Sequence, residues 1–329
     1  MTVSRALTGN VEISKSTRER VLRTARAMGY QPNRWARSLV TRQSSIIGVV
    51  IPDIAHSYFA DITFGIEEAI DGYDYDILLC HSRGDAEREK SEIAMLVGSR
   101  VDGLIVASVQ PYKGFEDFER LRSMNIPLVL VDRFFSGAQF SCVRVDDVAV
   151  GRLAARHLLA LGRRRMAHIA GPALSPALLR KRGFTDELRS SGIEIGREFM
   201  PRGDFEIESG RAAMKKLLLL SERPDAVFAA NDPMAIGAVY ACREAGLEVP
   251  RDVSIVGAGN IEGPHHPNPF LTTIDWPRVE LGRRAAELLI SAIRGERPEP
   301  AEIVLNPELL VRQSTAARQA IVPPAALSV

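Results

Sequence analysis

From residue 45 onward, short apolar runs alternate with longer amphipathic segments. Runs of four to six apolar residues are typical of strands buried on both faces, and apolar residues at i, i+3 and i+4 are typical of helices. The expected strands are 46–51, 75–80, 103–107, 127–131, 166–170, 225–230 and 252–257, and the expected helices are 59–70, 86–99, 151–162, 183–192 and 234–246. Strands that alternate with helices predict parallel sheets covered on both faces by helices.

This alternation occurs twice, with a break near 141–147. We therefore predict an α/β body with two similar lobes. The first lobe is expected at about 45–147 plus 276–300, and the second at about 148–275 plus 301–316. Ligands of such sheets bind beyond the carboxyl ends of the strands, and a cleft between two lobes is the default binding site.

The first 44 residues follow another plan. Residues 16–19, STRE, have capping-box spacing, an apolar stripe follows them, and Gly29 is expected to end this helix. A break at 30–33 precedes a short basic helix candidate, RWARSL, at 34–39. The segment has too few apolar residues to form a core of its own.

Net charge also differs between the first 44 residues and the rest of the chain. The 329 residues carry a net charge of +1, but residues 1–44 hold nine Lys or Arg against two Glu, so that this segment is +7 and the remainder −6. This asymmetry favours a small nucleic-acid-binding head on an acidic body, and the alternative is a solvated basic arm.

Composition argues against several other classes of protein. The three cysteines are isolated in apolar runs, which predicts neither disulfides nor a metal knuckle and suits a reducing cytoplasm. The chain shows no signal peptide and no apolar stretch of about 18 residues that could span a bilayer. We therefore expect a cytoplasmic protein without a membrane contact, a metal or a cofactor.

Motifs for catalysis are also missing. The stretch GAGNIEG at 257–263 differs from the dinucleotide-binding spacing G-x-G-x-x-G, and the prolines at 264 and 267 oppose the helix that would hold a pyrophosphate. The chain contains no phosphate-binding loop, no G-x-S-x-G and no H-E-x-x-H, and the adjacent His265 and His266 are poorly spaced to ligate one metal. We predict that the protein is not an enzyme.

Three short segments of the head carry residues suited to DNA. Thr2, Ser4 and Arg5 offer small and basic side chains for base edges and phosphates. Ser14 and Thr17 place hydroxyl groups at a helix start, where phosphates bind well. In the basic segment 34–39, an apolar side chain flanked by arginines is what wedging into the minor groove requires.

These segments together resemble the lactose-repressor and purine-repressor family of bacterial transcription regulators. The similarity runs in order through TVSRAL, ISKSTRERVLRTARAMGYQPNRWARSL, SSIIGVVIPDI, VDR, GDFEIESG, ANDPMAIGA, GLEVPRDVSIVG, PFLTTID and LLVRQST, and covers essentially the whole chain. It implies a partial helix-turn-helix head at 1–31, a hinge helix and linker at 32–44, and a periplasmic-binding-protein-like body at 45–329 that dimerises and binds a small effector.

The resemblance also assigns roles to residues of the head. Thr2, Val3, Ser4 and Arg5 fall on the recognition helix, and Ser14 and Thr17 match phosphate contacts. Asn33, Ala36 and Leu39 fall on the hinge helix, where Leu39 matches a leucine that a dimer inserts as a pair into the minor groove. The family's head normally starts with one more helix and a turn upstream, so we expect that Met1 is a truncated or wrongly assigned start.

For the effector the resemblance points to the cleft between the lobes. The expected effector-binding residues are Tyr58, Phe59, Arg133, Phe205, Asn231, Asp232 and Asn260, among which Phe205 matches an aromatic that stacks on purines. Packing and helix capping are the alternative roles of these residues. Relatives usually carry an acid where this chain has Gly259, and a cleft that lacks this acid but keeps Arg133 favours an anionic effector.

The sequence therefore predicts a repressor that binds a palindromic operator as a dimer under the control of a small molecule. The alternative is a ligand-binding module of the solute-binding type without competent DNA binding. Whether the effector induces or corepresses, and whether the protein is a dimer or a tetramer, stays open.

Overall fold

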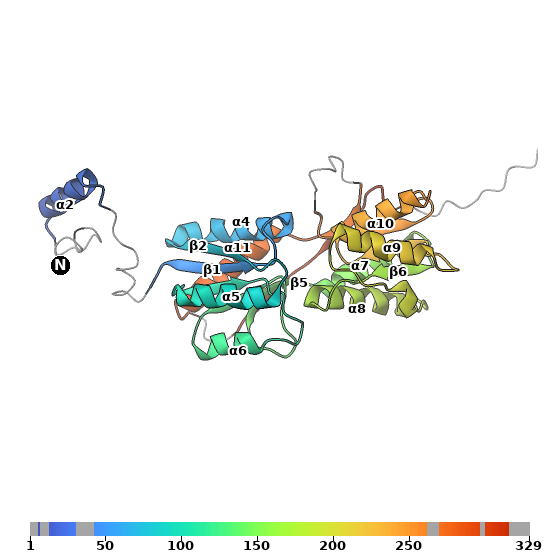
Figure 1. Ribbon diagram of the computed structural model, residues 1–329, viewed down its shortest axis with the longest axis horizontal. Helices are drawn as coiled ribbons and strands as arrows, with labels where there is room; N and C mark the ends of the chain where they lie inside the picture. The colour runs from blue at the N-terminus through green and yellow to red at the C-terminus, as the bar shows by residue number, and fades with distance from the viewer. Residues whose placement is uncertain (1–5, 7–12, 31–42, 262–269, 297–299, 316–329) are drawn as a thin grey trace, which may run out of the picture. The chain divides into compact units, whose positions relative to one another are not determined.

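The computed structural model describes residues 6, 13–30, 43–261, 270–296 and 300–315. The chain forms two compact units, residues 1–45 and 46–329 (Figure 1). Within the described ranges, no helix is long and apolar enough to cross a membrane.

The first unit contains helix α2, Lys15–Ala27. The predicted helix forms, but it begins before Ser16, because Ser14 is the residue that caps it: the Ser14 hydroxyl accepts a hydrogen bond from the Thr17 backbone N–H at 3.4 Å. Gly29 has φ +60° just after the helix and so ends it as expected. No residue of α2 is buried.

The second unit begins with a six-stranded parallel sheet in the order β10-β5-β4-β3-β1-β2. Its strands are β1 Ile46–Ile51, β2 Asp76–His81, β3 Gly103–Val106, β4 Leu128–Val131, β5 Ser141–Val145 and β10 Glu302–Leu305. Helices α4 and α11 cover one face and α5 and α6 the other (Figure 1). These helices are α4 Ser57–Ile70, followed by the 3-10 turn η1 Asp71–Tyr73, α5 Ala86–Gly98, α6 Glu116–Ser123 and α11 Arg278–Ile293.

The second lobe has a five-stranded sheet in the order β11-β9-β8-β7-β6, in which only β11 is antiparallel. Its strands are β6 Met166–Ile169, β7 Ala226–Ala229, β8 Ser254–Ala258, β9 Thr272–Asp275 and β11 Glu308–Leu310. Helices α7 and α8 cover one face and α9 and α10 the other. They are α7 Asp147–Ala160, α8 Ser175–Ser190, α9 Ile207–Leu218 and α10 Asp232–Glu244, with a 3-10 turn η2 at Arg197–Phe199.

The predicted two-lobed α/β fold is confirmed, and all seven predicted strands form with ends shifted by at most two residues. The chain passes from the first lobe to the second within the expected break at 141–147, because β5 ends the first run of strands and α7, which follows at once, packs on α8 of the second lobe. One expectation was wrong. The segment 301–316 does not belong wholly to the second lobe, because β10 pairs with β5 in the first sheet. Short, half-exposed edge strands of this kind have no clear hydrophobic signature.

Helix α8 also begins well before the predicted residue 183. The stretch 170–182 resembles a loop in sequence because it holds two prolines. Pro176 lies in the first turn of α8, where proline is tolerated because the N–H groups there have no partner in the helix.

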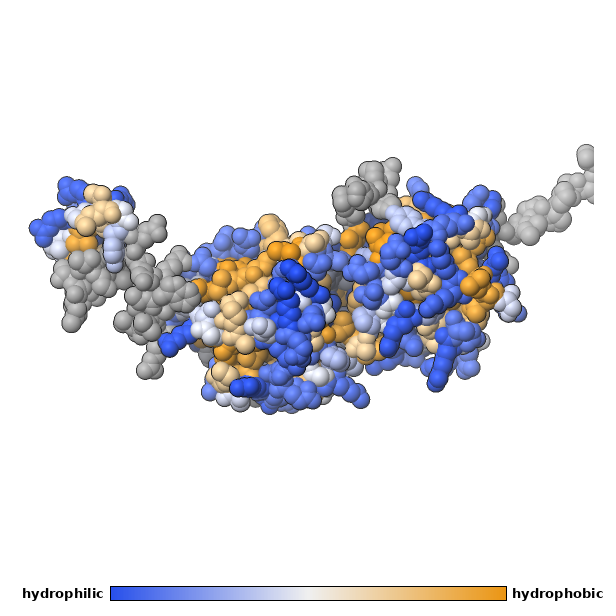
Figure 2. Space-filling view, in the orientation of Figure 1, coloured by the Kyte–Doolittle hydropathy of each residue, from blue (hydrophilic) through white to orange (hydrophobic). Residues whose placement is uncertain are grey.

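One edge of the first sheet exposes apolar side chains. Phe64 on α4, Leu79 on the edge strand β2 and Met95 on α5 are all exposed. Figure 2 shows hydrophobic residues over the α4 side of this lobe.

Candidate functional site

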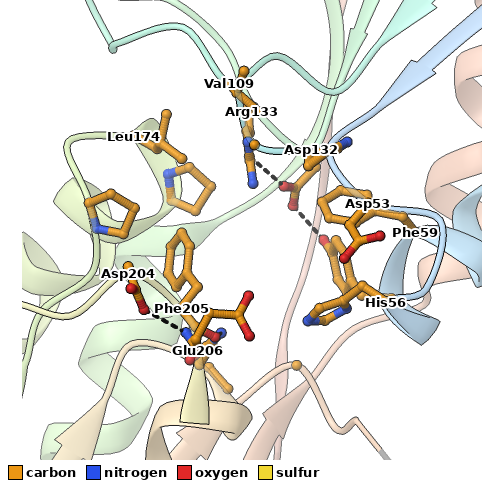
Figure 3. Close-up of a pocket in the computed structure, with 18 of the residues that line it drawn as sticks. Asp53, His56, Phe59, Val109, Asp132, Arg133, Leu174, Asp204, Phe205 and Glu206 are labelled. Carbon is orange, nitrogen blue, oxygen red and sulfur yellow. Dashed lines mark hydrogen bonds and ion pairs between the residues drawn. The ribbon is translucent and has the colours of Figure 1, made fainter. Parts of the chain in front are cut away.

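A cavity of about 470 Å³ lies between the carboxyl ends of the two sheets. Loops and helix starts from both lobes contribute to it, as expected for doubly wound sheets (Figure 3). Its lining consists of Pro52, Asp53, His56, Tyr58, Phe59, Gly84, Val109, Pro111, Asp132, Arg133, Pro172, Ala173, Leu174, Pro176, Arg180, Asp204, Phe205, Glu206, Asn231, Ala258, Gly259, Ile261 and Trp276.

Aromatic rings form the first-lobe wall and the floor. Tyr58 and Phe59 begin α4 and meet edge to face with ring centroids 5.1 Å apart. Trp276 lies between β9 and α11, where the chain returns to the first lobe, and is 3% exposed. Such walls suit a flat or ring-shaped ligand.

A chain of buried hydrogen bonds fixes these rings. The Tyr58 hydroxyl donates to the Asp132 carboxylate and accepts a hydrogen bond from Trp276 Nε1 at 3.2 Å. Burial, and then the charge of Asp132, raise the pKa of Tyr58 well above its usual value. Tyr58 therefore stays neutral and serves as a donor at neutral pH.

Two arginines line the cavity, and both already contact protein acceptors. Arg133 Nη1 donates to the Ser108 carbonyl at 2.9 Å, and its Nε lies 3.5 Å from the Asp132 carboxylate. Arg180 is buried, donates from Nε to Asp147 at 2.8 Å and from Nη1 to the Ala230 carbonyl at 2.8 Å. Its guanidinium also lies 4.8 Å from the Trp276 ring centroid.

Phe205 enters from the second lobe with an unusual backbone. Its φ is +79°, in the left-handed region that bulky residues rarely adopt. Asn231 Nδ2 donates to the Phe205 carbonyl at 2.8 Å, and the ring lies against Gly171, where a Cβ would come within 2.6 Å of it. Backbone strain held in place by neighbours is common at ligand-binding sites.

Carboxylates from both lobes lie at the cavity mouth. Asp53 follows β1, and Asp204 and Glu206 precede α9. Burial raises the pKa of Glu206, and the charges of Asp204 and Asp53 raise it further, because carboxylates of the two lobes lie close enough to repel one another. With Asp132, four carboxylates and two guanidiniums line the cavity.

Comparison with known proteins identifies the chain's relatives. The family model for bacterial regulatory proteins of the lacI family matches residues 1–33, and that for a periplasmic binding protein-like domain matches 155–315. The transcriptional repressor CytR of Escherichia coli K12 is 35% identical over 318 residues, covering 96% of this chain and 92% of CytR. The transcriptional regulator CelR of Thermobifida fusca is 34% identical, covering 95% of this chain and 94% of CelR.

The chain belongs to the LacI family.

Solved LacI-family structures agree with this assignment. A lac repressor dimer bound to operator and the anti-inducer ONPF is 29% identical and superposes with a TM-score of 0.85, over 96% of this chain and 95% of that one. A complex of the transcriptional regulator CelR with cellobiose is 32% identical with a TM-score of 0.76, over 94% of each chain. This LacI-family protein is a DNA-binding transcriptional regulator, and the prediction that it is not an enzyme is confirmed by its relatives.

Five of the seven residues expected to bind the effector line the cavity of this LacI-family protein. Tyr58, Phe59, Arg133, Phe205 and Asn231 line it. The role expected of Asn231 changes, however. Its Oδ1 accepts from the Met234 N–H at 3.1 Å and caps α10, while its Nδ2 holds Phe205, so both polar atoms are used within the protein.

Asp232 and Asn260, also expected to bind the effector, are absent from the cavity lining. Asp232 is buried and accepts from the Thr273 hydroxyl at 2.7 Å and the Ile261 N–H at 2.8 Å. Asn260 Oδ1 accepts from Arg312 Nη2 at 2.7 Å. Both side chains therefore fix the loop after β8 instead of facing the ligand space.

Most of the residues expected to contact DNA lie outside the described part of the chain. Ser14 and Thr17 are described, and their hydroxyls are 2.9 Å apart at the start of α2. The remaining expected DNA-binding residues lie outside the described residues: Thr2, Val3, Ser4, Arg5, Asn33, Ala36 and Leu39.

Sequence reasoning missed several lining residues. Asp132 stands beside Arg133 in the VDR stretch, so its place at a strand end was a usable signal. Trp276 and Arg180 gave no local signal, because their positions depend on how the second lobe packs on the first. Among the described residues, no group of three or more potential ligands could hold a metal ion.

Proposed function

We propose that this protein represses transcription by binding a palindromic operator as a homodimer, and that a small molecule in the cavity controls its affinity for DNA. The observation that carries the proposal is the cavity itself, because residues from both lobes line it. A ligand that touches both lobes binds one relative arrangement of them better than others, and so shifts the population of conformations.

We further propose that the effector is an uncharged, hydroxyl-rich ring. The anionic effector favoured by the sequence fits the cavity poorly, because four carboxylates line it and both arginines already have protein partners. Carboxylates accept hydrogen bonds from hydroxyl groups, and the rings of Phe59, Phe205 and Trp276 can pack on a sugar or nucleoside face. The cellobiose complex of CelR is a related case.

The dimer is proposed to use the apolar edge of the first sheet, namely Phe64, Leu79 and Met95. These residues belong to three adjoining elements, and the strand β2 has an open edge. Exposed apolar patches of this kind mark contact surfaces between proteins. The lac repressor dimer is a related assembly.

Selection from random double-stranded DNA tests the operator. We expect an inverted repeat to be enriched, with an affinity that falls steeply as salt rises because Lys and Arg displace counterions from phosphates. Replacing Leu39 with Ala is expected to weaken binding by disturbing the minor-groove wedge. Enrichment of no sequence would favour the solute-binding alternative.

Matched ligand pairs test the effector class. Thermal shift of the purified chain is measured with ribose against ribose 5-phosphate, and with neutral nucleosides against their monophosphates. We expect only neutral compounds to raise the melting temperature, since binding to the folded state stabilises it. A larger shift with the phosphorylated member of a pair would contradict the proposal. The same compounds added to operator titrations report whether DNA is released or bound.

Light scattering coupled to size exclusion tests the dimer. Phe64→Glu is expected to give a monomer, because a charge buried in an apolar interface is costly. The matched control is Met124→Glu, which adds the same charge at an exposed methionine after α6. A Phe64→Glu protein that remains dimeric would place the interface elsewhere.

A further inference from the structure

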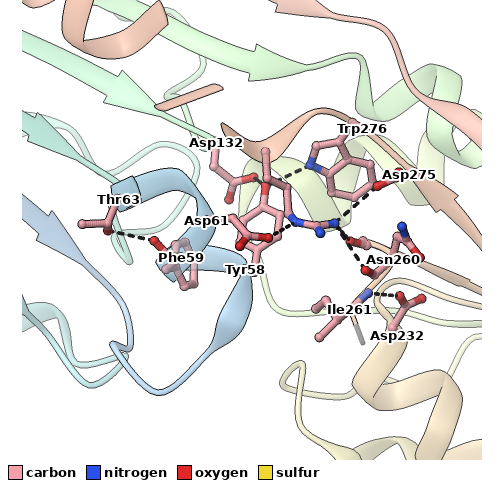
Figure 4. Close-up of polar contacts among 12 residues, drawn as sticks. Tyr58, Phe59, Asp61, Thr63, Asp132, Asp232, Asn260, Ile261, Asp275 and Trp276 are labelled. Atoms are coloured by element: carbon pink, nitrogen blue, oxygen red, sulfur yellow. Dashed lines mark hydrogen bonds and ion pairs between the residues drawn. The ribbon is translucent and has the colours of Figure 1, made fainter. Parts of the chain in front are cut away.

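Arg278, the first residue of α11, joins the two lobes beside the cavity. Figure 4 shows three of the residues that Arg278 contacts, Asp61, Asp275 and Asn260. Its Nε donates to Asp61 on α4 at 2.7 Å. Its Nη1 donates to the carbonyls of Gly259 and Asn260, which follow β8 of the second lobe, and lies 3.3 Å from the carboxylate of Asp275 at the end of β9. One guanidinium therefore contacts a first-lobe helix and a second-lobe loop at the same time.

The loop that Arg278 contacts is part of the cavity wall. Gly259 and Ile261 line the cavity. Gly259 has φ +121° and Asn260 has φ +49°, conformations that glycine adopts freely and asparagine tolerates, so the loop can turn here without strain. The backbone N–H groups also have partners, with Gly259 donating to Ile274 and Ile261 to Asp232, each at 2.8 Å.

The helix that Arg278 contacts carries the opposite wall. Asp61 lies one turn after Tyr58, whose ring lines the cavity. Phe64, one turn further along α4, belongs to the apolar edge proposed for dimerisation. Because Arg278 is hydrogen-bonded both to the loop at 259–261 and to α4, a displacement of the loop changes the contacts of this helix.

We infer that Arg278 is a positioning residue that couples the loop 259–261, and hence occupancy of the cavity, to α4. The inference rests on the proposed effector control and deepens it. The planar guanidinium can donate in several fixed directions at once, which lets it bind a carboxylate and two carbonyls together. A lysine ammonium is a compact point charge and does not reproduce this geometry.

Amide hydrogen exchange on the full chain tests the coupling without effector or DNA. Exchange of the Gly259 and Ile261 amides is followed in Arg278→Met, Arg278→Lys and Asp61→Asn. Asp61 is on the other lobe, so a local role of Arg278 at its two carbonyls would leave Asp61→Asn without effect on these amides. Glu68→Gln is the matched control, because Glu68 pairs with Arg283 between the same two helices at 3.7 Å without reaching the loop.

We expect Arg278→Met to speed exchange of the loop amides by about tenfold, as loss of a hydrogen bond to a charged group implies. Asp61→Asn should speed it by a smaller factor, because the amide oxygen still accepts from Arg278 and Asp275 still pairs with Arg278. Arg278→Lys should recover only part of the protection, Glu68→Gln should change nothing, and the Asp61→Asn, Arg278→Met double variant should match Arg278→Met alone. Unchanged exchange in Asp61→Asn, or additive effects in the double variant, would overturn the coupling. Either result leaves operator binding and effector binding to be judged by their own assays.

Discussion

The hydrogen bond from Asn231 to the Phe205 carbonyl can be removed by Asn231→Asp, which also adds a negative charge to the cavity. The cost of that charge is the same with Phe205 or with glycine at 205, so it cancels when the two backgrounds are compared. The new side chain has the same shape, and one oxygen can still accept from the Met234 N–H, so the cap of α10 is kept. The other oxygen replaces the donor that lies 2.8 Å from the Phe205 carbonyl. A donor-acceptor pair thus becomes a pair of acceptors.

The cost follows from what the carbonyl loses. A buried acceptor left without its donor costs about 1–3 kcal/mol. The left-handed backbone of Phe205 costs roughly 1–2 kcal/mol relative to a glycine both before and after the substitution, so it does not add to this loss, but the lost bond is one that opposes the strain. We expect Asn231→Asp to lower the free energy of unfolding by about 2 kcal/mol.

Phe205→Gly separates the two contributions. A glycine at 205 adopts φ +79° without strain and can turn its carbonyl toward water. Asn231→Asp should therefore cost about 1 kcal/mol less in the Phe205→Gly background than in the original chain. The four proteins are compared by urea denaturation at pH 7, followed by circular dichroism and by tryptophan fluorescence.

Additivity of the two substitutions within about 0.5 kcal/mol would refute this reasoning, because independent sites add to that precision. It would mean that Asn231 does not hold the backbone of Phe205. Asn231→Ala is a useful reference, since it removes the cap as well and should cost about 1 kcal/mol more than Asn231→Asp.

Two more predictions concern stability alone. His168 is fully buried against Phe228, and burial lowers the pKa of its imidazole to about 4, whereas the unfolded chain binds that proton near pH 6.5. The free energy of unfolding should therefore fall by about 3 kcal/mol from this group as the pH drops from 7 to 4, and His168→Asn should remove that part of the pH dependence in denaturation curves. Gly65→Ala would place a Cβ 2.0 Å from the Val279 carbonyl on α11, and we expect it to lower the free energy of unfolding by about 3 kcal/mol. Gly98→Ala is the control: its Cβ would meet open space, so this variant should be as stable as the original chain or more stable when both are compared by thermal unfolding.

The sequence predicted the fold well because the relevant signals are local. Seven parallel strands were found, namely β1 to β4 and β6 to β8, because each is a short apolar run and each helix repeats at 3.6 residues. The edge strand β10 was assigned to the wrong lobe because it is short and half-exposed, and its partner β5 lies about 160 residues away. Pairing over such a distance leaves no local trace.

The candidate site shows the same division. Tyr58, Phe59 and Phe205 were predictable as aromatics at strand ends and helix starts. Asn231 lines the cavity as expected and also caps α10, whereas Asp232 does not line it, because which of two adjacent side chains faces the cavity depends on where α10 begins. If α10 began one residue later, Asp232 would be its N-cap and not a buried hydrogen-bond acceptor.

By itself, the sequence determined the alternation of strands and helices, the basic first segment against an acidic body, and the family, since these depend on residue order and type. The tertiary structure decided which charges remain available in the cavity. It pairs Arg180 with Asp147 and Arg133 with Ser108, and brings the carboxylates of both lobes together, which supports our proposal of an uncharged effector in place of the expected anion. These contacts join segments that are far apart in the sequence and become close only on folding. A buried charge without a partner is costly, so each charged group pairs with the acceptor or donor that the packed lobes place beside it.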